Sequence, residues 1–451
     1  MKGKLKFLVV FILYLFIPNP IYSSESGWEI QNSNTTNVLH SVNFIDNNTG
    51  WTCGINGIIL KTTNSGINWI SQISHTDVYL VAIYFLNANV GFTSGFKSEN
   101  YPTIGYRCII LKTLDGGINW DTIDTSTDYY ITNIDFINST TGYFSGGLYG
   151  NGTNKILKTT NSGITLEEQN SNSIGNLFSI GFANSSTGYS CGMWGNIVKT
   201  TNGGSNWFVQ SVLPKHILTS ITFLDENTGY VTGGDLSWEG QIVPSSYIGK
   251  TTNGGINWIS QIDITNRHIL YSIHFVNQFT GYACGSPDFT TISGCWHNSL
   301  YKTTNSGNEW IELTTPVIQS LTSIYFIDAY TGFAVGCDGK ILKTITGGVG
   351  ITNLSNEIPS GYNLFQNYPN PFNPVTKIKF DIPSMVNGEL SIVNLKVYNA
   401  LGKEVQTLVD QKLSPGSYEV DFDGSNFSSG IYFYSLQTED FSQSRKMFLL
   451  K

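Results

Sequence analysis

The chain has 451 residues, of which 24 are lysine or arginine and 32 are aspartate or glutamate, giving a formal net charge of −8. This length is sufficient for two or three domains. Charged residues make up only 12% of the chain, and this mildly acidic balance argues against nucleic acid as the main partner. The 47 glycines and numerous aromatic residues are typical of short strands joined by tight turns.

The N-terminal segment reads MKGKLKFLVVFILYLFIPNPIYSSES. Three lysines precede an apolar run over residues 7–17, and Ser23 and Ser24 offer a small-residue cleavage site. This pattern predicts a secretory signal peptide over residues 1–23, because the apolar run is too short for a membrane span. No later segment is apolar enough to cross a bilayer, so we expect an exported protein without a membrane span after signal removal.

A repeated stretch dominates the next three hundred residues. ILKTTNSGINW at residues 59–69 returns as ILKTLDGGINW, IVKTTNGGSNW and IGKTTNGGINW. Its lysine recurs every 41 to 52 residues, at Lys61, Lys112, Lys158, Lys199, Lys250, Lys302 and Lys343. Each unit holds four strand-like runs with alternating apolar residues, separated by glycine-rich turns. Seven such units predict an all-β fold, a seven-bladed β-propeller over residues 24–350.

The two ends of the repeat predict how the ring closes. The seventh unit stops at ILKTITGG, and no tryptophan strand follows Gly348. The isolated stretch SGWEIQNS near the N-terminus matches the missing fourth strand. Trp28 is therefore expected to complete the last blade, because closure removes an exposed sheet edge.

Within each repeat, TTNSGINW has the form T-x-N/D-x-G-x-x-W. It is complete in five units, whereas residues 159–166 keep the frame but end in leucine. The pattern resembles the Asp-box of bacterial neuraminidase repeats, and the box positions are Asn64, Asp115, Asn161, Asn202, Asn253 and Asn305. Asn or Asp can bond nearby amides, glycine can take positive φ, and tryptophan can pack into the blade. The resemblance implies a structural element on the face opposite the active face.

Length variation falls between the second and third strands, in residues 96–109, 234–247 and 286–299. In a propeller these loops share one face, where binding sites usually lie. Three of the ten tryptophans also lie between the second and third strands, in three consecutive units, rather than at repeat positions. The candidate ligand-binding residues are Trp194, Trp238, Trp296, Tyr101, Tyr106 and Phe289. They could stack on sugars or anchor a protein; alternatively, each ring packs onto a neighbouring blade.

A catalytic role is the alternative to this binding role. Sialidases hold their substrate with an arginine triad, but the propeller offers only Arg107 and Arg267. Another glycoside hydrolase would need two suitably spaced carboxylates. The loop candidates are Glu99, Asp235, Glu239 and Asp288, although single loop carboxylates are usually solvated. The six histidines show no metal-ligand spacing and no cofactor motif is present, so the sequence favours a non-enzymatic protein.

Six cysteines in an exported chain raise the question of disulfides. Cys53, Cys191 and Cys284 share one repeat position, which favours small buried strand residues. Cys284 and Cys295 nevertheless bracket one loop and form a candidate disulfide.

After a predicted linker at residues 351–361, the chain reads NLFQNYPNPFNPVTKIKFDIP, VNLKVYNALGKEV and SSGIYFY, with a basic, apolar end. These motifs, in this order, closely resemble the C-terminal sorting domain of the type IX secretion system over residues 362–451. The strand and turn pattern predicts a small antiparallel β-sandwich. The resemblance implies delivery by the type IX machinery across the outer membrane, hence a secreted or cell-surface location.

The propeller is also similar to the photosystem II assembly-factor family, whose repeats carry GY/W…G…I.KTTNGG..W in the same order. That resemblance spans residues 26–348 and implies a non-enzymatic scaffold that binds protein. The arginine poverty and the sorting domain differ from that family, so only the architecture is transferred. The expected partner is an extracellular glycan or protein.

Overall fold

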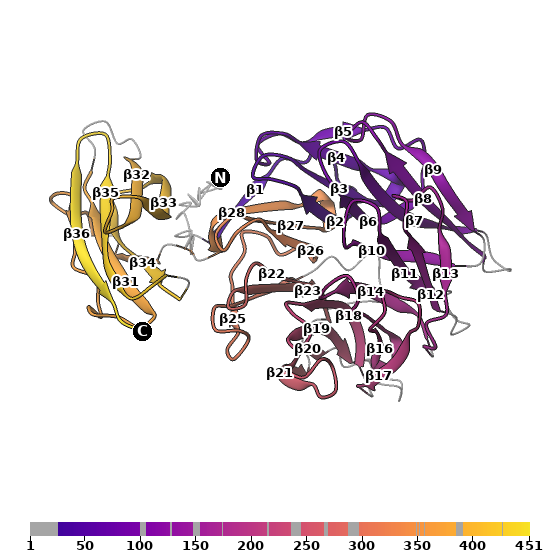
Figure 1. Cartoon of the computed structure of the whole chain (residues 1–451). Helices are drawn as coiled ribbons and strands as arrows, with labels where there is room; N and C mark the ends of the chain where they lie inside the picture. The colour runs from indigo at the N-terminus through magenta and orange to yellow at the C-terminus, as the bar shows by residue number, and fades with distance from the viewer. Residues whose placement is uncertain are drawn as a thin grey trace, which may run out of the picture.

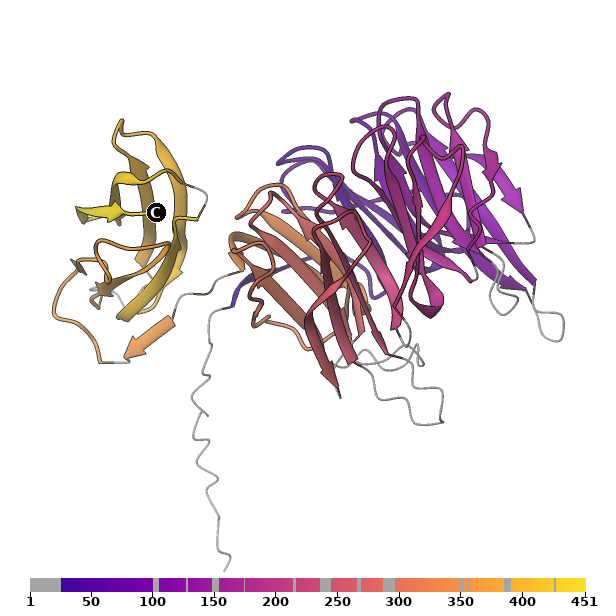
Figure 2. The ribbon, with the colours of Figure 1, turned by 60° about the horizontal axis from the view of Figure 1, so that its bottom comes forward.

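The computed structural model describes residues 26–99, 105–126, 129–147, 154–173, 175–213, 216–235, 245–265, 269–286, 297–348, 350, 352–355, 357–384, 391–425 and 427–451. Within these ranges the strands form nine four-stranded sheets. Seven of the sheets are arranged as blades around a ring, and the other two lie outside it (Figures 1 and 2). The predicted seven-bladed propeller is confirmed.

The first six blades are each built from four consecutive antiparallel strands, with the first strand at the centre of the ring (Figure 1). Blades 1 to 3 contain β2 (Leu39–Phe44), β3 (Gly50–Gly54), β4 (Ile59–Thr62), β5 (Ile70–Gln72); β6 (Tyr79–Phe85), β7 (Gly91–Glu99), β8 (Gly105–Thr113), β9 (Asp121–Ser126); and β10 (Tyr130–Phe136), β11 (Gly142–Gly147), β12 (Asn154–Thr159), β13 (Glu167–Gln169). Blades 4 to 6 contain β14 (Leu177–Phe182), β15 (Gly188–Gly192), β16 (Asn196–Thr200), β17 (Phe208–Val212); β18 (His216–Phe223), β19 (Gly229–Asp235), β20 (Ser245–Thr251), β21 (Ile259–Thr265); and β22 (Ile269–Phe275), β23 (Gly281–Ser286), β24 (Ser299–Thr303), β25 (Ile311–Glu312).

The seventh blade joins the two ends of the repeat. It combines β26 (Leu321–Phe326), β27 (Gly332–Gly336) and β28 (Ile341–Gly348) with the N-terminal β1 (Gly27–Gln31). Ile30 pairs with Leu342 in the antiparallel ladder. Trp28 is 3% exposed and meets Phe326 edge to face, with ring centroids 5.8 Å apart. The predicted closure by the N-terminal strand is confirmed, and β1 covers the edge that β28 would otherwise expose.

Side chains on the innermost strands link adjacent blades. In six of the seven interfaces, a serine or asparagine side chain accepts a hydrogen bond from a backbone N–H of the next blade, at 3.1–3.4 Å. The acceptors are Ser41, Asn133, Ser179, Ser220, Ser272 and Ser323. These bonds satisfy edge amides that the sheet itself cannot pair.

The repeated lysine makes a second link between blades. Lys61 Nζ donates to the Gly116 carbonyl at 2.9 Å, and Lys250 Nζ donates to the Ser306 carbonyl at 2.6 Å. In both cases the acceptor lies in the Asp-box turn of the following blade. Each repeat lysine also lies 5.0–5.9 Å from the centroid of the second-strand aromatic ring of its own blade. The sequence showed the spacing of this lysine but not its role in joining neighbouring blades.

The Asp-box residues shape the turn before the fourth strand. Asn64 Oδ1 accepts a hydrogen bond from the Asn68 N–H at 2.9 Å, while Thr62 Oγ1 accepts one from the Gly66 N–H at 2.9 Å. Gly66 has φ +81°, a conformation that favours glycine. A related turn also occurs in blade 7, where the Gly348 N–H donates to Thr344 Oγ1 at 2.8 Å. The pattern T-x-N/D-x-G did not include this turn, because a threonine replaces the asparagine. In the structure β28 also runs through the turn.

The C-terminal part forms two sheets around one shared apolar core. One contains β29 (Thr352–Ser355), β34 (Gly416–Asp423), β31 (Val375–Ile382) and β30 (Asn363–Leu364); the other contains β33 (Glu404–Leu413), β32 (Ser391–Asn399), β35 (Gly430–Gln437) and β36 (Ser442–Leu449). All the strand pairs in both sheets are antiparallel. Thr352–Ser355 was expected to be linker, but it pairs with β34 and adds a strand to the sandwich.

Candidate binding face

Of the six predicted ligand-binding residues, the structure describes the backbone of two and the side chain of one. Trp238, Trp296, Tyr101 and Phe289 lie outside the described residues, as does the signal peptide. Tyr106 lies on β8 opposite Ser98. The expected long loop of blade 2 is instead largely a hairpin, since β7 extends to Glu99 and β8 begins at Gly105. Trp194 is therefore the one predicted ligand-binding residue whose side chain the structure describes.

Trp194 lies in η2 (Met193–Gly195), the short turn between the second and third strands of blade 4. Its side chain is 44% exposed. Its φ is +61°, a left-handed conformation that is unfavourable for a bulky residue and tolerated best by glycine, asparagine and aspartate. The equivalent turns η1 (Ile55–Gly57) and η3 (Cys337–Gly339) place Asn56 and Asp338 at this position, at φ +57° and +54°. Blade 4 thus has a tryptophan at a turn position where the two equivalent turns have asparagine or aspartate, and an indole is presented there.

The residues around this turn hold it in place. The Met193 N–H donates to the Asn176 carbonyl at 2.9 Å, and the Leu213 N–H donates to the Gly195 carbonyl at 2.9 Å. Asn176 is itself fixed, because its Nδ2 donates to Tyr130 Oη at 3.0 Å. A Cβ on residue 175 would lie 3.0 Å from Cδ1 of Trp194, so Gly175 leaves room for the ring. The indole is therefore displayed from a fixed backbone.

A polar group at the neighbouring end of blade 5 includes one predicted carboxylate. Asp235 pairs with His216 across β18 and β19, and its N–H donates to Ser245 Oγ at 2.9 Å. The His216 ring stacks on Tyr247, with centroids 4.0 Å apart. Burial raises the pKa of Tyr247 to about 12, so this phenol stays neutral at physiological pH. Glu239 and Asp288 lie outside the described residues, and the structure gives no separation between a pair of catalytic carboxylates.

Titratable side chains along the innermost strands are used between blades. Asp135 Oδ2 accepts a hydrogen bond from the Phe182 N–H at 3.1 Å, and burial raises the pKa of Asp135 to about 6. Tyr84 Oη donates to the Phe136 carbonyl at 3.3 Å. Burial lowers the pKa of His274 to about 4, so the imidazole is neutral at physiological pH. Asp135 and Tyr84 therefore serve contacts between adjacent blades.

The cysteines contradict the predicted pairing. Cys284 is a free thiol with no exposed surface, so it does not form a disulfide with Cys295, which lies outside the described residues. Cys53, Cys108 and Cys191 are likewise free and buried, and burial raises the pKa of all four thiols. Cys337 is disulfide-bonded. The strand residue Cys284 points into the blade core, and this is why sequence proximity failed to predict the pair.

Among the residues that the structure describes, no group of three histidine, cysteine, aspartate or glutamate side chains is arranged to hold a metal ion. Within the same ranges, no helix is long and apolar enough to span a membrane.

Comparison with known families finds one match in each part of the chain. Residues 366–450 match the secretion system C-terminal sorting domain, and residues 21–129 match the photosynthesis system II assembly factor YCF48. No curated protein sequence matches the chain significantly.

Among solved structures, YCF48 bound to D1 peptide aligns at 19% identity with a TM-score of 0.53, covering 71% of this chain and 95% of that one. YCF48 from Cyanidioschyzon merolae aligns at 17% identity and 0.51, covering 70% and 98%. The GH74 enzyme of Niastella koreensis aligns at 14% identity and 0.55, covering 92% and 73%. At these identities the similarity establishes the fold alone.

A sorting domain of this kind directs export, so the protein is secreted or carried to the outer cell surface. The chain combines a YCF48-like propeller of the BNR type with a C-terminal sorting domain of the type IX secretion system.

Proposed function

We propose that the propeller is a non-enzymatic binding module that captures an extracellular glycan or protein through the loop face on which Trp194 lies. The observation that carries this proposal is the exposed indole at φ +61°, held where two sister blades use asparagine and aspartate. Backbone strain of this kind is retained mainly where a side chain is needed for function. A flat, rigid aromatic ring can stack on a sugar or fill a pocket in a protein.

The solved YCF48 structure with a bound D1 peptide shows that a propeller of this fold can hold a peptide. Trp238 and Trp296 are proposed to extend the same face, because they occupy the corresponding loops of blades 5 and 6. The sorting domain is proposed to act as the delivery signal and to take no part in ligand binding.

The test is a binding screen of the chain over residues 26–451 against soluble oligosaccharides and peptides, beside the Trp194→Ala/Trp238→Ala/Trp296→Ala variant. Phe208→Ala is the matched control, because Phe208 is 43% exposed but lies on the outer strand β17. Binding that is lost in the triple variant and kept in the control supports the proposal. Binding unchanged in the triple variant contradicts it.

The alternative, a glycoside hydrolase that is not a sialidase, is tested by measuring glycan length by mass spectrometry in the same incubations. Shortened glycans whose production requires Asp235, Glu239 or Asp288 would establish catalysis and overturn the non-enzymatic proposal.

A further inference from the structure

Blade 3 departs from the repeat at its interface with blade 2. In the other six blades a buried or partly buried tryptophan meets the first-strand phenylalanine edge to face, at 5.8–6.1 Å. Blade 3 has Leu166 in that position. The adjoining outer strand also differs: Ile123 lies beside the Asp-box glycine of blade 3, where Gln72 and Gln169 lie beside the equivalent glycines of blades 2 and 4. Both changes replace a larger or polar side chain with a branched apolar one.

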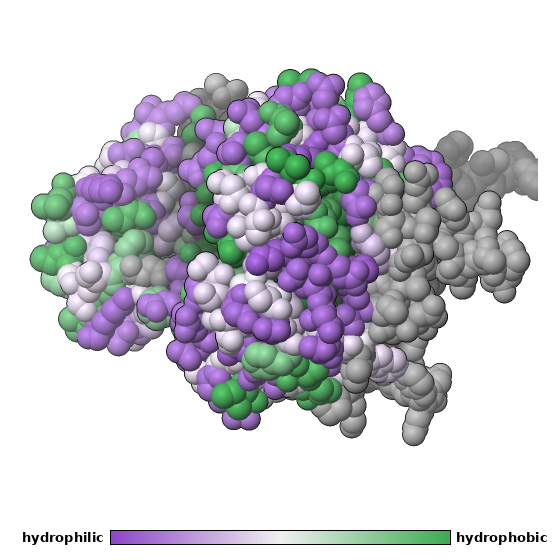
Figure 3. Space-filling model, turned by 45° about the vertical axis from the view of Figure 1, so that its right-hand side comes forward, coloured by the Kyte–Doolittle hydropathy of each residue, from purple (hydrophilic) through white to green (hydrophobic). Residues whose placement is uncertain are grey.

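A groove of about 340 Å³ lies at this position. It is lined by Ile123, Asp124, Tyr129, Lys155, Leu157, Ile164, Leu166 and Glu168. This volume is at the lower end of the range of about 300–1,000 Å³ found for small-ligand sites. On one face of the molecule, Figure 3 shows apolar residues gathered in separate patches among hydrophilic ones. The groove itself is lined by four aliphatic side chains and four polar or charged ones.

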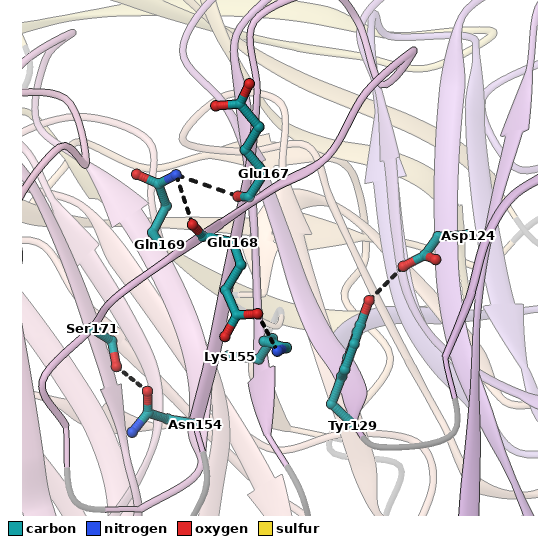
Figure 4. Close-up of polar contacts among 8 residues, drawn as sticks. All are labelled: Asp124, Tyr129, Asn154, Lys155, Glu167, Glu168, Gln169 and Ser171. Atoms are coloured by element: carbon teal, nitrogen blue, oxygen red, sulfur yellow. Dashed lines mark hydrogen bonds and ion pairs between the residues drawn. The ribbon is translucent and has the colours of Figure 1, made fainter.

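The polar walls are organised by two contacts, drawn in Figure 4. Tyr129 Oη donates a hydrogen bond to Asp124 Oδ2 at 2.5 Å on one side. On the other, Lys155 Nζ lies 2.6 Å from Glu168 Oε2 and 4.9 Å from the centroid of the Tyr129 ring. Two carboxylates and one ammonium group therefore line the groove, which gives it a net negative charge. The Glu168 side chain is 61% exposed and remains accessible to an incoming cation.

We propose that this groove binds an extended segment of a partner protein that inserts an aromatic side chain next to a basic residue. The aromatic ring would occupy the space that an indole of the chain fills in the six sister blades, against Leu157 and Leu166. The basic residue would be attracted by Asp124 and Glu168, since charge complementarity selects a cationic partner. The adjacent β13 is the outermost strand of its sheet, so its free edge can hydrogen-bond an extended backbone.

The test measures binding of a Lys-Trp-Lys peptide to the chain over residues 26–451, with methyl NMR on isoleucine and leucine. We expect shifts at Ile123, Ile164 and Leu166, and affinity at least about tenfold higher than for Lys-Ala-Lys, because the indole becomes buried. Leu166→Trp, alone and with Ile123→Gln to restore the sister-blade pair, should fill the groove and abolish binding. Ile256→Trp is the matched control, because Ile256 is 62% exposed in the equivalent turn region of blade 5.

A second variant does not depend on repacking. Glu168→Lys should reverse the preference, so that Glu-Trp-Glu binds better than Lys-Trp-Lys. Glu167→Lys makes the same change of net charge one residue away, where alternation along the strand directs the side chain to the opposite face, and should keep the original preference.

Equal affinity for Lys-Trp-Lys and Lys-Ala-Lys, or shifts at these methyl groups that persist in both groove-filling variants, would overturn the proposal. Binding of an oligosaccharide in place of every peptide would overturn it in favour of a sugar site. This groove is separate from the Trp194 face, so Trp194→Ala should leave Lys-Trp-Lys binding unchanged whichever way the loop-face proposal is decided.

Discussion

Ser323 Oγ accepts a hydrogen bond from the Val42 N–H at 3.3 Å, although the two residues are 281 positions apart. This bond joins the innermost strand of blade 7 to that of blade 1, so the ring is closed at its centre as well as by β1 at its rim. Ala82 occupies the equivalent position in blade 2 and has no side-chain acceptor to offer the next blade. The chain therefore contains interfaces with this side-chain hydrogen bond and one interface, between blades 2 and 3, in which Ala82 cannot make it.

Ser323→Ala is expected to lower the free energy of unfolding by about 1 kcal/mol, because an edge amide loses its partner. Ala82→Ser is expected to raise it by a similar or smaller amount. Urea denaturation of both variants measures the difference. Equal stability of Ser323→Ala and the parent chain would show that water replaces the lost acceptor.

Trp28→Ala is expected to destabilise the propeller by about 3–5 kcal/mol, the usual cost of truncating a buried tryptophan. The indole is 3% exposed and closes blade 7 against Phe326. Trp194→Ala is the control, because that ring is 44% exposed and should cost little stability. Equal losses in the two variants would argue against the closing role of β1.

Trp194→Asn is expected to raise the stability of the fold by about 1 kcal/mol, because asparagine tolerates the left-handed conformation better than tryptophan. The reciprocal change Asn56→Trp should lower it, since η1 has the same geometry at φ +57°. Thermal unfolding of the two variants checks the opposite signs. A stabilised Trp194→Asn variant that has lost its ligand would show stability given up for binding.

Asp115 is expected to make the fold sensitive to acid. A hydrogen bond from the Asn119 N–H, with further bonds from the Asn119 and Thr113 side chains, lowers the pKa of Asp115 from 3.8 to about 2. Because the unfolded chain binds this proton more readily, the contribution is present above about pH 4 and is lost as pH falls from 4 towards 2. Unfolding of the parent and of Asp115→Asn over pH 2–7 should show a smaller acid-dependent loss in the variant. Parallel curves would assign the acid sensitivity to other carboxylates.

Lys302 is expected to make the stability of the fold depend on pH in the alkaline range. Burial lowers the pKa of its ammonium group from 10.5 to about 8. Between these values the unfolded chain binds more protons than the folded one, so the contribution of Lys302 to stability rises as pH increases from 8 to 10.5. Lys302→Met should remove this rise while keeping the apolar stem packed. Denaturation at pH 7, 8.5 and 10 compares the slopes, and an unchanged slope would contradict the assignment.

The architecture could be predicted from the amino-acid sequence. Its repeat period, the turn chemistry of T-x-N/D-x-G and the unpaired strand at Trp28 predicted seven blades and their closure, because each of these signals depends on residues close together in the chain or on counting. The motifs after residue 361 likewise identified the sorting domain. The loop tryptophans directed attention to one face, yet only Trp194 can be placed within the described residues.

Contacts between residues of different blades became known only from the folded ring. The repeat lysines were visible in the sequence, but in five repeats the carbonyl that accepts from the lysine lies about fifty residues away on the next blade. The sequence also showed leucine in place of tryptophan at Leu166. A groove forms there only because Ile123, Tyr129 and Lys155 converge on the same space in the folded chain. Cys284 and Cys295 are near in sequence, but the strand directs Cys284 into the blade core, where it is a free thiol. Local sequence fixes turns and strands, but packing between blades depends on which side chains the closed ring brings face to face.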